Sequence, residues 1–338
     1  MIPSIIIDVN GGDNSPNALV EGAVLSLHNK GFEVVLLGGQ QAIERELSKY
    51  IYAKERLHIV DAIDIVYNTD KPTDVVRAKK DSSMIKGLTM LRDTNSCIGM
   101  VSVGNTGAYL AGGTFVVGRL QGVLRPSLSA LVPTIGGRKV CICDAGANVD
   151  SKPEYINQYA ILASCYVRAF VDIDNPRVGL LNNGVEETKG NDTLKLAHKL
   201  LSDNQHINFV GNIEARYALD DIVDVIVADG LLGNVLLKSI EGTAISMFKM
   251  LKKNIMQSGI SGKIGALLLK KAFGKLRRHM DYQSVGGAPL LGLNKIVLKA
   301  HGSSQAVSIA QSVWDIKKMH DEHMIDNIKE LIAHERSK

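Results

Sequence analysis

Apolar runs of strand length alternate with helical patterns along this chain. The first run, residues 4–9 (SIIIDV), reads as a buried strand, and a Gly11-Gly12 turn follows before a helix that begins near Pro16. Further predicted strands lie at 33–37, 57–60, 97–103, 139–143, 177–181, 207–210, 223–228 and 295–299. Such alternation builds a mostly parallel sheet with helices on both faces. We therefore predict a doubly wound α/β fold in which residues 1–338 form a single large α/β/α domain.

One stretch departs from this alternation. Residues 231–285 follow a mostly helical pattern that is interrupted at Ser258-Gly259 and Ser261-Gly262, which predicts a helical hairpin inserted into the sheet domain. Residues 249–278 carry nine Lys and Arg and no Asp or Glu, whereas the whole chain has 39 basic and 35 acidic residues. The positive charge is thus concentrated in one segment, and a concentrated patch steers anionic partners.

The predicted hairpin is amphipathic. On a helical wheel, one arc holds Leu268, Leu269, Phe273 and Leu276, and the opposite side holds Lys263, Lys270, Lys271, Lys275, Arg277 and Arg278. An ordinary helix would pack its apolar arc on its own core or on a dimer partner. The alternative is a basic amphipathic helix that lies on an anionic membrane surface, and the absence of acidic residues favours it.

Composition argues against several classes of protein. A net charge of +4 is too balanced for a nucleic-acid-binding protein, and no run reaches the roughly 18 apolar residues of a membrane span. The first residues show neither a basic leader nor a cleavable apolar segment, so we expect no signal peptide. The cysteines lack metal-ligand spacing, which indicates a reducing cytoplasm and no metal site. Cys141 and Cys143 share one face of a strand and read as a buried pair.

Five polar turns that contain glycine follow predicted strands, at residues 8–13, 102–107, 144–148, 229–234 and 300–304. Each leads to a helix N-terminus, where backbone N–H groups and the helix dipole favour phosphate or another oxyanion. A single such turn can be purely structural, but we expect five at one sheet edge to form a polar crevice. The candidate binding residues are Gly11, Gly12, Asp13, Gly104, Thr106, Gly107, Asn148, Asp229, Asn234, Ser303 and Ser304.

The side chains that could act on a substrate are carboxylates, amides, lysines and one histidine in or near these turns: Asp8, Asp13, Asn105, Asn148, Lys152, Lys189, Lys299 and His301. The two carboxylates read as turn caps rather than metal ligands. The two amides are either caps or ligands to a substrate oxygen. The lysines are phosphate partners or solvated surface residues, and the histidine is a candidate catalytic group.

Several familiar motifs are absent. The first strand is not followed by G-x-G-x-x-G, and the chain has no P-loop, no H-E-x-x-H and no G-x-S-x-G. A dinucleotide site of the usual kind is therefore disfavoured. We expect chemistry that relies on an oriented phosphate and a polarised carbonyl group, with no cofactor.

Seven segments of this chain resemble the phosphate acyltransferase family of bacterial phospholipid synthesis. They are IDVNGGD (7–13), VSVGNTGAYLAGG (101–113), CDAGANVDSKPE (143–154), GLLNNGVEETKGND (179–192), FVGNIEAR (209–216), DGLLGNVLLKSIEG (229–242) and GGAPLLGLNKIVLKAHGSS (286–304). The segments follow the family's order and span nearly the whole chain. Two residues depart from the family's pattern: Asn10 replaces a methionine, and Ser151 replaces a cysteine, so no acyl-cysteine intermediate can form at position 151.

The resemblance implies transfer of a long-chain fatty acyl group from acyl carrier protein to inorganic phosphate, which yields acyl phosphate. It also implies the doubly wound fold of isocitrate and isopropylmalate dehydrogenases and of phosphotransacetylases. It further implies a cytoplasmic homodimer, peripherally associated with the inner face of the membrane where a downstream glycerol-3-phosphate acyltransferase works. The basic hairpin would then contact the acidic carrier protein, the anionic membrane, or both.

We expect a mechanism without a covalent acyl-enzyme. The phosphate cradle is assigned to backbone amides at 104–107 and 302–304, with Lys152 or Lys189 neutralising charge. Asn105 or His301 would donate a hydrogen bond to the thioester carbonyl oxygen, and His301 could protonate the departing thiolate.

Three other readings stay open: a nicotinamide-dependent dehydrogenase, an acetyl-phosphate-forming enzyme that uses coenzyme A, and a non-catalytic membrane adaptor that recruits the carrier. The third needs the basic hairpin but none of the five turns, so their presence argues against it.

Overall fold

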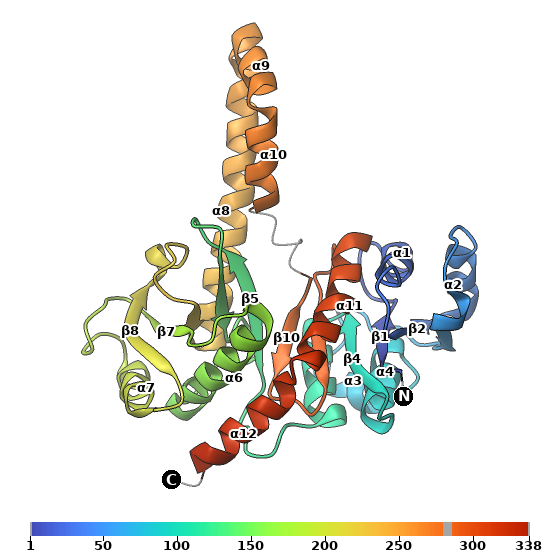
Figure 1. Ribbon diagram of the computed structural model, residues 1–338, viewed down its shortest axis with the longest axis horizontal. Helices are drawn as coiled ribbons and strands as arrows, with labels where there is room; N and C mark the ends of the chain where they lie inside the picture. The colour runs from blue at the N-terminus through green and yellow to red at the C-terminus, as the bar shows by residue number, and fades with distance from the viewer. Residues whose placement is uncertain (1, 280–285, 337–338) are drawn as a thin grey trace.

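The computed structural model describes residues 2–279 and 286–336 (Figure 1). One sheet contains eleven strands in the order β3-β2-β1-β4-β11-β10-β5-β6-β9-β7-β8. The strands are β1 (Ser4–Asp8), β2 (Glu33–Gly38), β3 (Leu57–Asp61), β4 (Cys97–Ser102), β5 (Ser127–Pro133), β6 (Lys139–Cys143), β7 (Arg177–Asn182), β8 (Asn208–Glu214), β9 (Val225–Val227), β10 (Ala288–Leu291) and β11 (Ile296–Lys299). The mostly parallel α/β sheet expected from the alternation is confirmed.

Although β5 is followed directly by β6, helices separate most of these strands as far as β9. They are α1 (Asn17–Ser26), α2 (Gln40–Leu47), α3 (Pro72–Ala78), α4 (Ser83–Asp93), α5 (Thr106–Gly112), α6 (Pro153–Val171), α7 (Asp192–Asp203), α8 (Gly230–Gln257), α9 (Gly259–Leu268), α10 (Lys270–His279), α11 (Ala306–Asp321) and α12 (Met324–Arg336). Short helical turns are η1 (Lys54–Arg56), η2 (Gly113–Val117) and η3 (Ala215–Tyr217).

The sheet has two parallel halves that run in opposite directions. Strands β3, β2, β1, β4 and β11 are parallel, and so are β6, β9, β7 and β8. Between them, β10 is antiparallel to both β11 and β5, and β5 is antiparallel to β6. The expectation that all five turns follow strands at one sheet edge is therefore wrong, because β6 and β9 end at the other edge. Strands β5 and β10, which reverse the direction, are absent from the sequence prediction.

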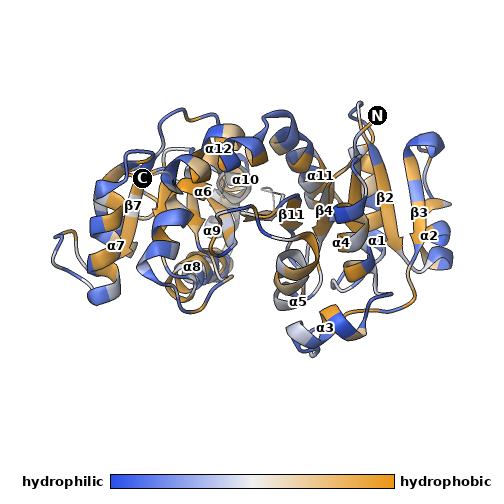
Figure 2. Ribbon diagram, turned by 90° about the horizontal axis from the view of Figure 1, so that it is seen from below, coloured by the Kyte–Doolittle hydropathy of each residue, from blue (hydrophilic) through white to orange (hydrophobic). Residues whose placement is uncertain are grey.

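Helices cover both faces of the sheet, which explains why the first strand is a continuous apolar run. Ile5 and Ile7 pack in a core with α1, α6 and α11, whereas Ile6 points to the other face and packs with α4 and α5. All three isoleucines are fully buried. Strands buried on both faces lose the polar alternation of half-exposed strands. In Figure 2 the strands are accordingly mostly hydrophobic, and hydrophilic residues lie on the outer sides of the helices.

Between β9 and β10 the chain leaves the sheet. Helix α8 extends away from it, and α9 and α10 return alongside α8 (Figure 1). Gly259, with φ +66°, stands where α8 ends and α9 begins, in a conformation that suits glycine. The second expected interruption, Ser261-Gly262, lies inside α9 instead of breaking it.

Much of the apolar surface of α9 is exposed, and Leu268 keeps 80% of its surface accessible. Leu269, Lys270 and Lys271 are also exposed, and Phe273 is half-buried. The side chains of Lys263, Lys275, Leu276, Arg277 and Arg278, and residues 280–285 altogether, lie outside the described part of the chain. Among the described residues no helix is both long and apolar enough to cross a membrane.

Candidate active site

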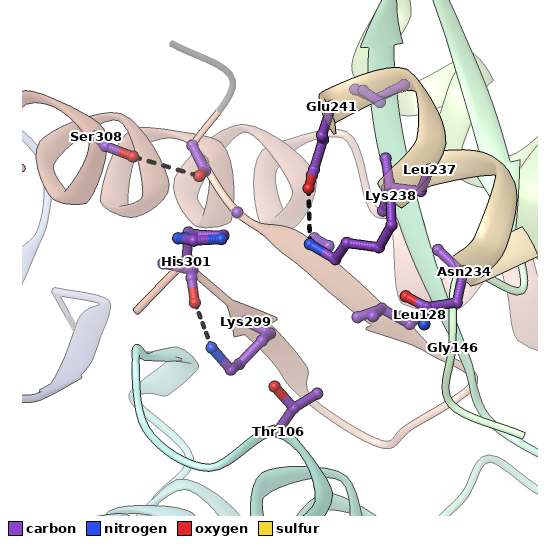
Figure 3. Close-up of a pocket in the computed structure, with 17 residues that line it drawn as sticks. Thr106, Leu128, Gly146, Asn234, Leu237, Lys238, Glu241, Lys299, His301 and Ser308 are labelled. Atoms are coloured by element: carbon purple, nitrogen blue, oxygen red, sulfur yellow. Dashed lines mark hydrogen bonds and ion pairs between the residues drawn. The ribbon is translucent and has the colours of Figure 1, made fainter. Parts of the chain in front are cut away.

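A cavity of about 210 Å³ lies among the end of β11, the start of α5, the middle of β5 and the first turns of α8. Its polar lining residues are Thr106, Asn234, Lys238, Glu241, Lys299, His301 and Ser308. Gly146 also lines the cavity, and Figure 3 shows it together with the polar residues. Residues from four of the five predicted turns thus line one cavity, although the strands that carry them run in opposite directions.

The turn after β6 folds back onto the start of β5, which brings Gly146 to the cavity. Asp144 is buried and accepts backbone N–H bonds from Leu128 at 3.0 Å, from Ala147 at 2.9 Å and from Asn148 at 2.8 Å. The Asn148 amide donates to the Pro126 carbonyl at 2.8 Å. Asn148 therefore shapes this turn, and it is absent from the cavity lining.

Helix α8 begins in direct backbone contact with that turn. Asp229 caps the helix by accepting the Leu232 N–H at 2.9 Å. A Cβ atom on Gly230 would lie 2.3 Å from the Asn148 carbonyl oxygen, and one on Gly233 would lie 1.9 Å from the Asp144 carbonyl oxygen. These two glycines let α8 approach closely enough for the next residue, Asn234, to line the cavity.

His301 is held by the serine two residues after it. The Ser303 backbone N–H donates to Nδ1 at 3.2 Å, and the Ser303 hydroxyl lies 2.8 Å from the same nitrogen. A backbone N–H can only donate, so Nδ1 is an acceptor and the neutral ring carries its proton on Nε2. Burial lowers the pKa of His301 below its ordinary value of 6.5, and the nearby charge of Lys238 lowers it further. Near neutral pH the ring is therefore an uncharged hydrogen-bond donor.

Of the three candidate lysines, Lys299 is the one that lines the cavity. Its Nζ donates to the Val103 carbonyl at 3.3 Å and to the Ala300 carbonyl. Burial lowers the pKa of Lys299 to about 8, while the charge of Asp8 opposes this change. Asp8 is itself buried and accepts the Ser102 hydroxyl at 2.7 Å.

The structure places the other two candidate lysines elsewhere. Lys152 is exposed at the N-terminus of α6, and Lys189 is exposed with its Nζ 3.9 Å from Glu186. Neither lines the cavity that holds His301. The sequence offered no basis for choosing Lys299 over these two, because each simply follows or precedes a polar turn.

The Gly11-Gly12 turn holds two other loops together. A Cβ atom on Gly11, whose φ is +85°, would lie 2.8 Å from Cα of Gly104. The Asp13 N–H donates to the Gly302 carbonyl at 2.9 Å. Gly11, Gly12 and Asp13 are not among the residues that line the cavity, so their evident role is to position the loops after β4 and β11.

Asn105 serves as a structural cap. Its Oδ1 accepts the Ala108 N–H at 3.0 Å, and its Nδ2 donates to the carbonyl oxygens of Tyr67 at 3.1 Å and Asp70 at 3.3 Å. One end of the amide thus caps α5, and the other end holds the loop before α3. The next residue, Thr106, begins α5 and lines the cavity.

Some backbone amides expected to cradle phosphate have partners within the protein. The Gly104 N–H donates to Ser102 Oγ at 3.1 Å, and the Ser304 N–H donates to the His301 carbonyl at 3.0 Å. Ser304 Oγ is buried with no hydrogen-bond partner in the described structure. The amides of Thr106 and Gly107, in the first turn of α5, have no intrahelical acceptors.

An ion pair that sequence reasoning missed forms part of the cavity wall. Lys238 Nζ lies 2.7 Å from Glu241 Oε2 on α8. The two residues follow Asn234 at helical spacing, so they share its face of α8. That spacing was the available signal, but it becomes useful only once Asn234 is known to face the cavity.

The cysteines are all buried. Burial raises the pKa of Cys143 and of Cys165 to about 12, so both remain protonated near neutral pH. Cys141 and Cys143 are a buried pair, as their strand spacing predicted. Within residues 2–279 and 286–336, no cluster of three or more His, Cys, Asp and Glu side chains is arranged to hold a metal ion.

Comparisons with known proteins agree with the resemblance in the sequence. A family model described as "Fatty acid synthesis protein" matches residues 4–327. The chain is 43% identical over 326 residues to the phosphate acyltransferase of Clostridium botulinum, covering 96% of this chain and 97% of that protein. It is also 43% identical over 315 residues to the phosphate acyltransferase of Streptococcus sanguinis, covering 93% and 94% of the two chains.

Solved structures show the same fold at low sequence identity. A phosphotransacetylase from Streptococcus pyogenes has a TM-score of 0.64 at 17% identity, covering 96% of this chain and 94% of that one. A structure described as a putative 4-hydroxythreonine-4-phosphate dehydrogenase from Salmonella typhimurium has a TM-score of 0.51 at 13% identity, covering 94% and 100%. The sequence relationships go further than these shared folds: this chain belongs to the phosphate acyltransferase family, a family of acyltransferases.

Proposed function

We propose that this protein transfers a long-chain fatty acyl group from acyl carrier protein to inorganic phosphate, and that it releases acyl phosphate for phospholipid synthesis. The observation that carries the proposal is the pairing, in one cavity, of a neutral His301 donor with the buried amine of Lys299. An acyl transfer to phosphate needs one group for the carbonyl oxygen and a cation for the phosphate. Relatives named phosphate acyltransferase support this choice of reaction.

In this proposal, phosphate lies between Lys299 and the first turn of α5. Thr106 lines the cavity, and the Thr106 and Gly107 amides lack intrahelical acceptors. Lys299 supplies the positive charge that we first assigned to Lys152 or Lys189, because those two are exposed outside the cavity. Asn234, Ser303 and Ser304 remain candidate neighbours of the substrates.

The His301 Nε2–H would donate to the thioester oxygen as negative charge develops there. A well-placed donor of this kind contributes about 3–4 kcal/mol to transition-state stabilisation. Holding phosphate in line with the carbonyl carbon contributes roughly 7–11 kcal/mol more when the reactants are well oriented. Phosphate is itself the nucleophile, so no acyl group is attached to the protein. The Asn105 amide is committed to helix α5, which leaves His301 as the donor.

The partners of the reaction follow from the same proposal. The exposed leucines and lysines of α9 and α10 would dock on an anionic membrane surface, where each basic residue contributes about 1 kcal/mol. The acidic carrier protein is the competing partner for this basic hairpin. We further propose a cytoplasmic homodimer, peripherally bound to the inner face of the membrane, that delivers acyl phosphate to a membrane glycerol-3-phosphate acyltransferase.

The deciding experiment follows the loss of acyl-carrier thioester with and without phosphate, and traps the product with hydroxylamine. After subtraction of the direct reaction of hydroxylamine with the thioester, measured without protein, the proposal expects hydroxamate to form only when phosphate is present. A covalently acylated protein during turnover, or loss of thioester without phosphate, would contradict direct attack. Faster reaction with short-chain acyl-coenzyme A would favour an acetyl-phosphate-forming enzyme instead. Reduction of a nicotinamide cofactor by hydroxy acids would favour a dehydrogenase.

A further inference from the structure

We propose that Lys299 is the proton carrier of the acyl transfer: its ammonium group protonates the departing thiolate, and the resulting amine recovers a proton from the acyl phosphate. This inference rests on the proposed function and deepens it. It assigns two steps to one residue, which lines the same cavity as His301.

The first argument is geometric. Lys299 is the last residue of β11, and two carbonyl oxygens hold its Nζ where β4 and β11 end, those of Val103 and Ala300. An ammonium group has three N–H donors, so these two described contacts leave one for a substrate atom. In the view of Figure 3, Lys299 lies between His301 and Thr106. The group is thus held where the thioester and the phosphate are proposed to meet.

The second argument concerns the need for an acid. Thiolate is the leaving group, and a neutral imidazole is a very weak acid. Because Ser303 donates its N–H to Nδ1 and the pKa of His301 is lowered, His301 is uncharged near neutral pH. It can donate a hydrogen bond to the carbonyl oxygen, but it carries no spare proton for sulfur. The role of acid, first assigned to His301, therefore falls to another group.

The third argument is the charge environment of Lys299. Burial lowers its pKa to about 8, and a thiol ordinarily titrates at about 8.5, so transfer between them is nearly balanced. The charged and titratable neighbours are Asp8 on β1, Lys238 and Glu241 on α8, and His301. Asp8 favours the ammonium form and Lys238 opposes it.

The proposed cycle balances in atoms and charge. HPO₄²⁻ attacks the carbonyl carbon, so a C–O bond forms, the C–S bond breaks and its electron pair stays on sulfur. Lys299 gives one proton to sulfur, which leaves a neutral amine, a thiol and a protonated acyl phosphate. A phosphate ester has a second pKa of about 6, so the acyl phosphate returns a proton to the amine. The net effect is that the proton of HPO₄²⁻ moves to the thiol.

The test compares the Lys299→Met variant with the wild type on two thioesters of the same acyl chain. One has an alkyl thiol as its leaving group, and the other has an aryl thiol, whose thiolate departs without an acid. We expect the variant to lose at least about a hundredfold in turnover on the alkyl thioester. On the aryl thioester we expect the loss in turnover of the variant to be at least about tenfold smaller than on the alkyl thioester.

Lys295→Met is the matched control. Lys295 lies just before β11, and its Nζ also donates to two carbonyl oxygens, of Cys97 at 2.8 Å and Thr94 at 3.4 Å, but it does not line the cavity. We expect its turnover to match the wild type on both thioesters. A Lys299→Arg variant covers the case in which Lys299→Met does not fold. The arginine keeps the positive charge, but its guanidinium is too weak an acid to protonate the thiolate.

Two results would separate the hypotheses. An equal loss on both thioesters, together with a raised KM for phosphate, would show that Lys299 only binds phosphate and would overturn the proton-carrier role. No phosphate-dependent turnover of either thioester by the wild type would instead refute the proposed function itself.

Discussion

The backbone N–H of Ser303 donates to Nδ1 of His301 across 3.2 Å. This bond places the ring proton of the neutral histidine on Nε2, because Nδ1 must accept. Because this donor belongs to the main chain, the turn sets the tautomer even without the Ser303 hydroxyl, which also lies 2.8 Å from Nδ1. The tautomer of the proposed catalytic donor is thus set by local backbone geometry between a strand and a helix.

The first prediction tests this donor. We expect His301→Gln to reduce turnover at least about tenfold with little change in stability, because His301 lies outside the hydrophobic core and its loss leaves no core cavity. Ser303→Ala keeps the backbone N–H and should retain most of the activity. Initial rates with saturating phosphate measure both effects, and thermal unfolding checks the fold. Full activity of His301→Gln would remove this residue from the mechanism.

The second prediction concerns the pH dependence of turnover. The active form has His301 neutral and Lys299 protonated. Because the pKa of His301 is lowered, the acid-side decline should lie below pH 6.5, and because the pKa of Lys299 is lowered to about 8, the alkaline-side decline should be centred near there. A profile of kcat against pH measures both, with the concentration of HPO₄²⁻ kept saturating at every pH. An alkaline decline that persists unchanged in Lys299→Met would assign it to a different group.

The third prediction tests the close approach of α8 to the turn after β6. A Cβ atom on Gly233 would lie 1.9 Å from the Asp144 carbonyl oxygen, so Gly233→Ala should displace α8, lower the unfolding free energy by about 1–3 kcal/mol and reduce activity. Gly242→Ala on the same helix is the control, because nothing lies within 4 Å of the added Cβ. That control should be neutral or stabilise by up to about 1 kcal/mol. Equal stability of the two variants in urea unfolding would contradict this interpretation.

The fourth prediction separates the membrane from the carrier protein as partner of the basic hairpin. Leu268 is 80% exposed and Phe273 is half-buried on α10. The double variant Leu268→Glu, Phe273→Glu should lose co-sedimentation with anionic vesicles, because carboxylates then replace the apolar contact and repel the surface. Its turnover with acyl carrier protein in the absence of vesicles should be unchanged. Binding to vesicles at the wild-type level would exclude the membrane role, and a raised KM for the carrier would favour the competing partner.

Much of the fold could be predicted because its signals are local. A run such as Ile5–Ile7 is apolar at every position, and the structure buries it between helices on both faces. Strands β5 and β10 were missed, although they join the two halves of the sheet. Strand β10 has only four residues, too short for a clear pattern, and it pairs with β5 over only two rungs.

The candidate site was predictable only in part. His301 and Thr106 were identified from their turns, and both line the cavity. The preference for Lys152 and Lys189 over Lys299 was not supported by their positions, because a lysine next to a polar turn has the same local pattern whether it faces solvent or a cavity. Lys238 and Glu241 were missed because their helical spacing from Asn234 points to the cavity only once Asn234 is known to face it.

By itself, the amino-acid sequence determined most of where the chain extends, turns and coils, since those choices depend largely on side chains that are neighbours along the backbone. Only the tertiary structure decided which of the candidate lysines lies in the same cavity as His301. The antiparallel strands β5 and β10 bring Gly146 and Asn234 from one half of the sheet to Lys299 and His301 of the other. Burial there removes water from the Lys299 amine and lowers its pKa, an effect that depends on residues more than one hundred positions away in the chain.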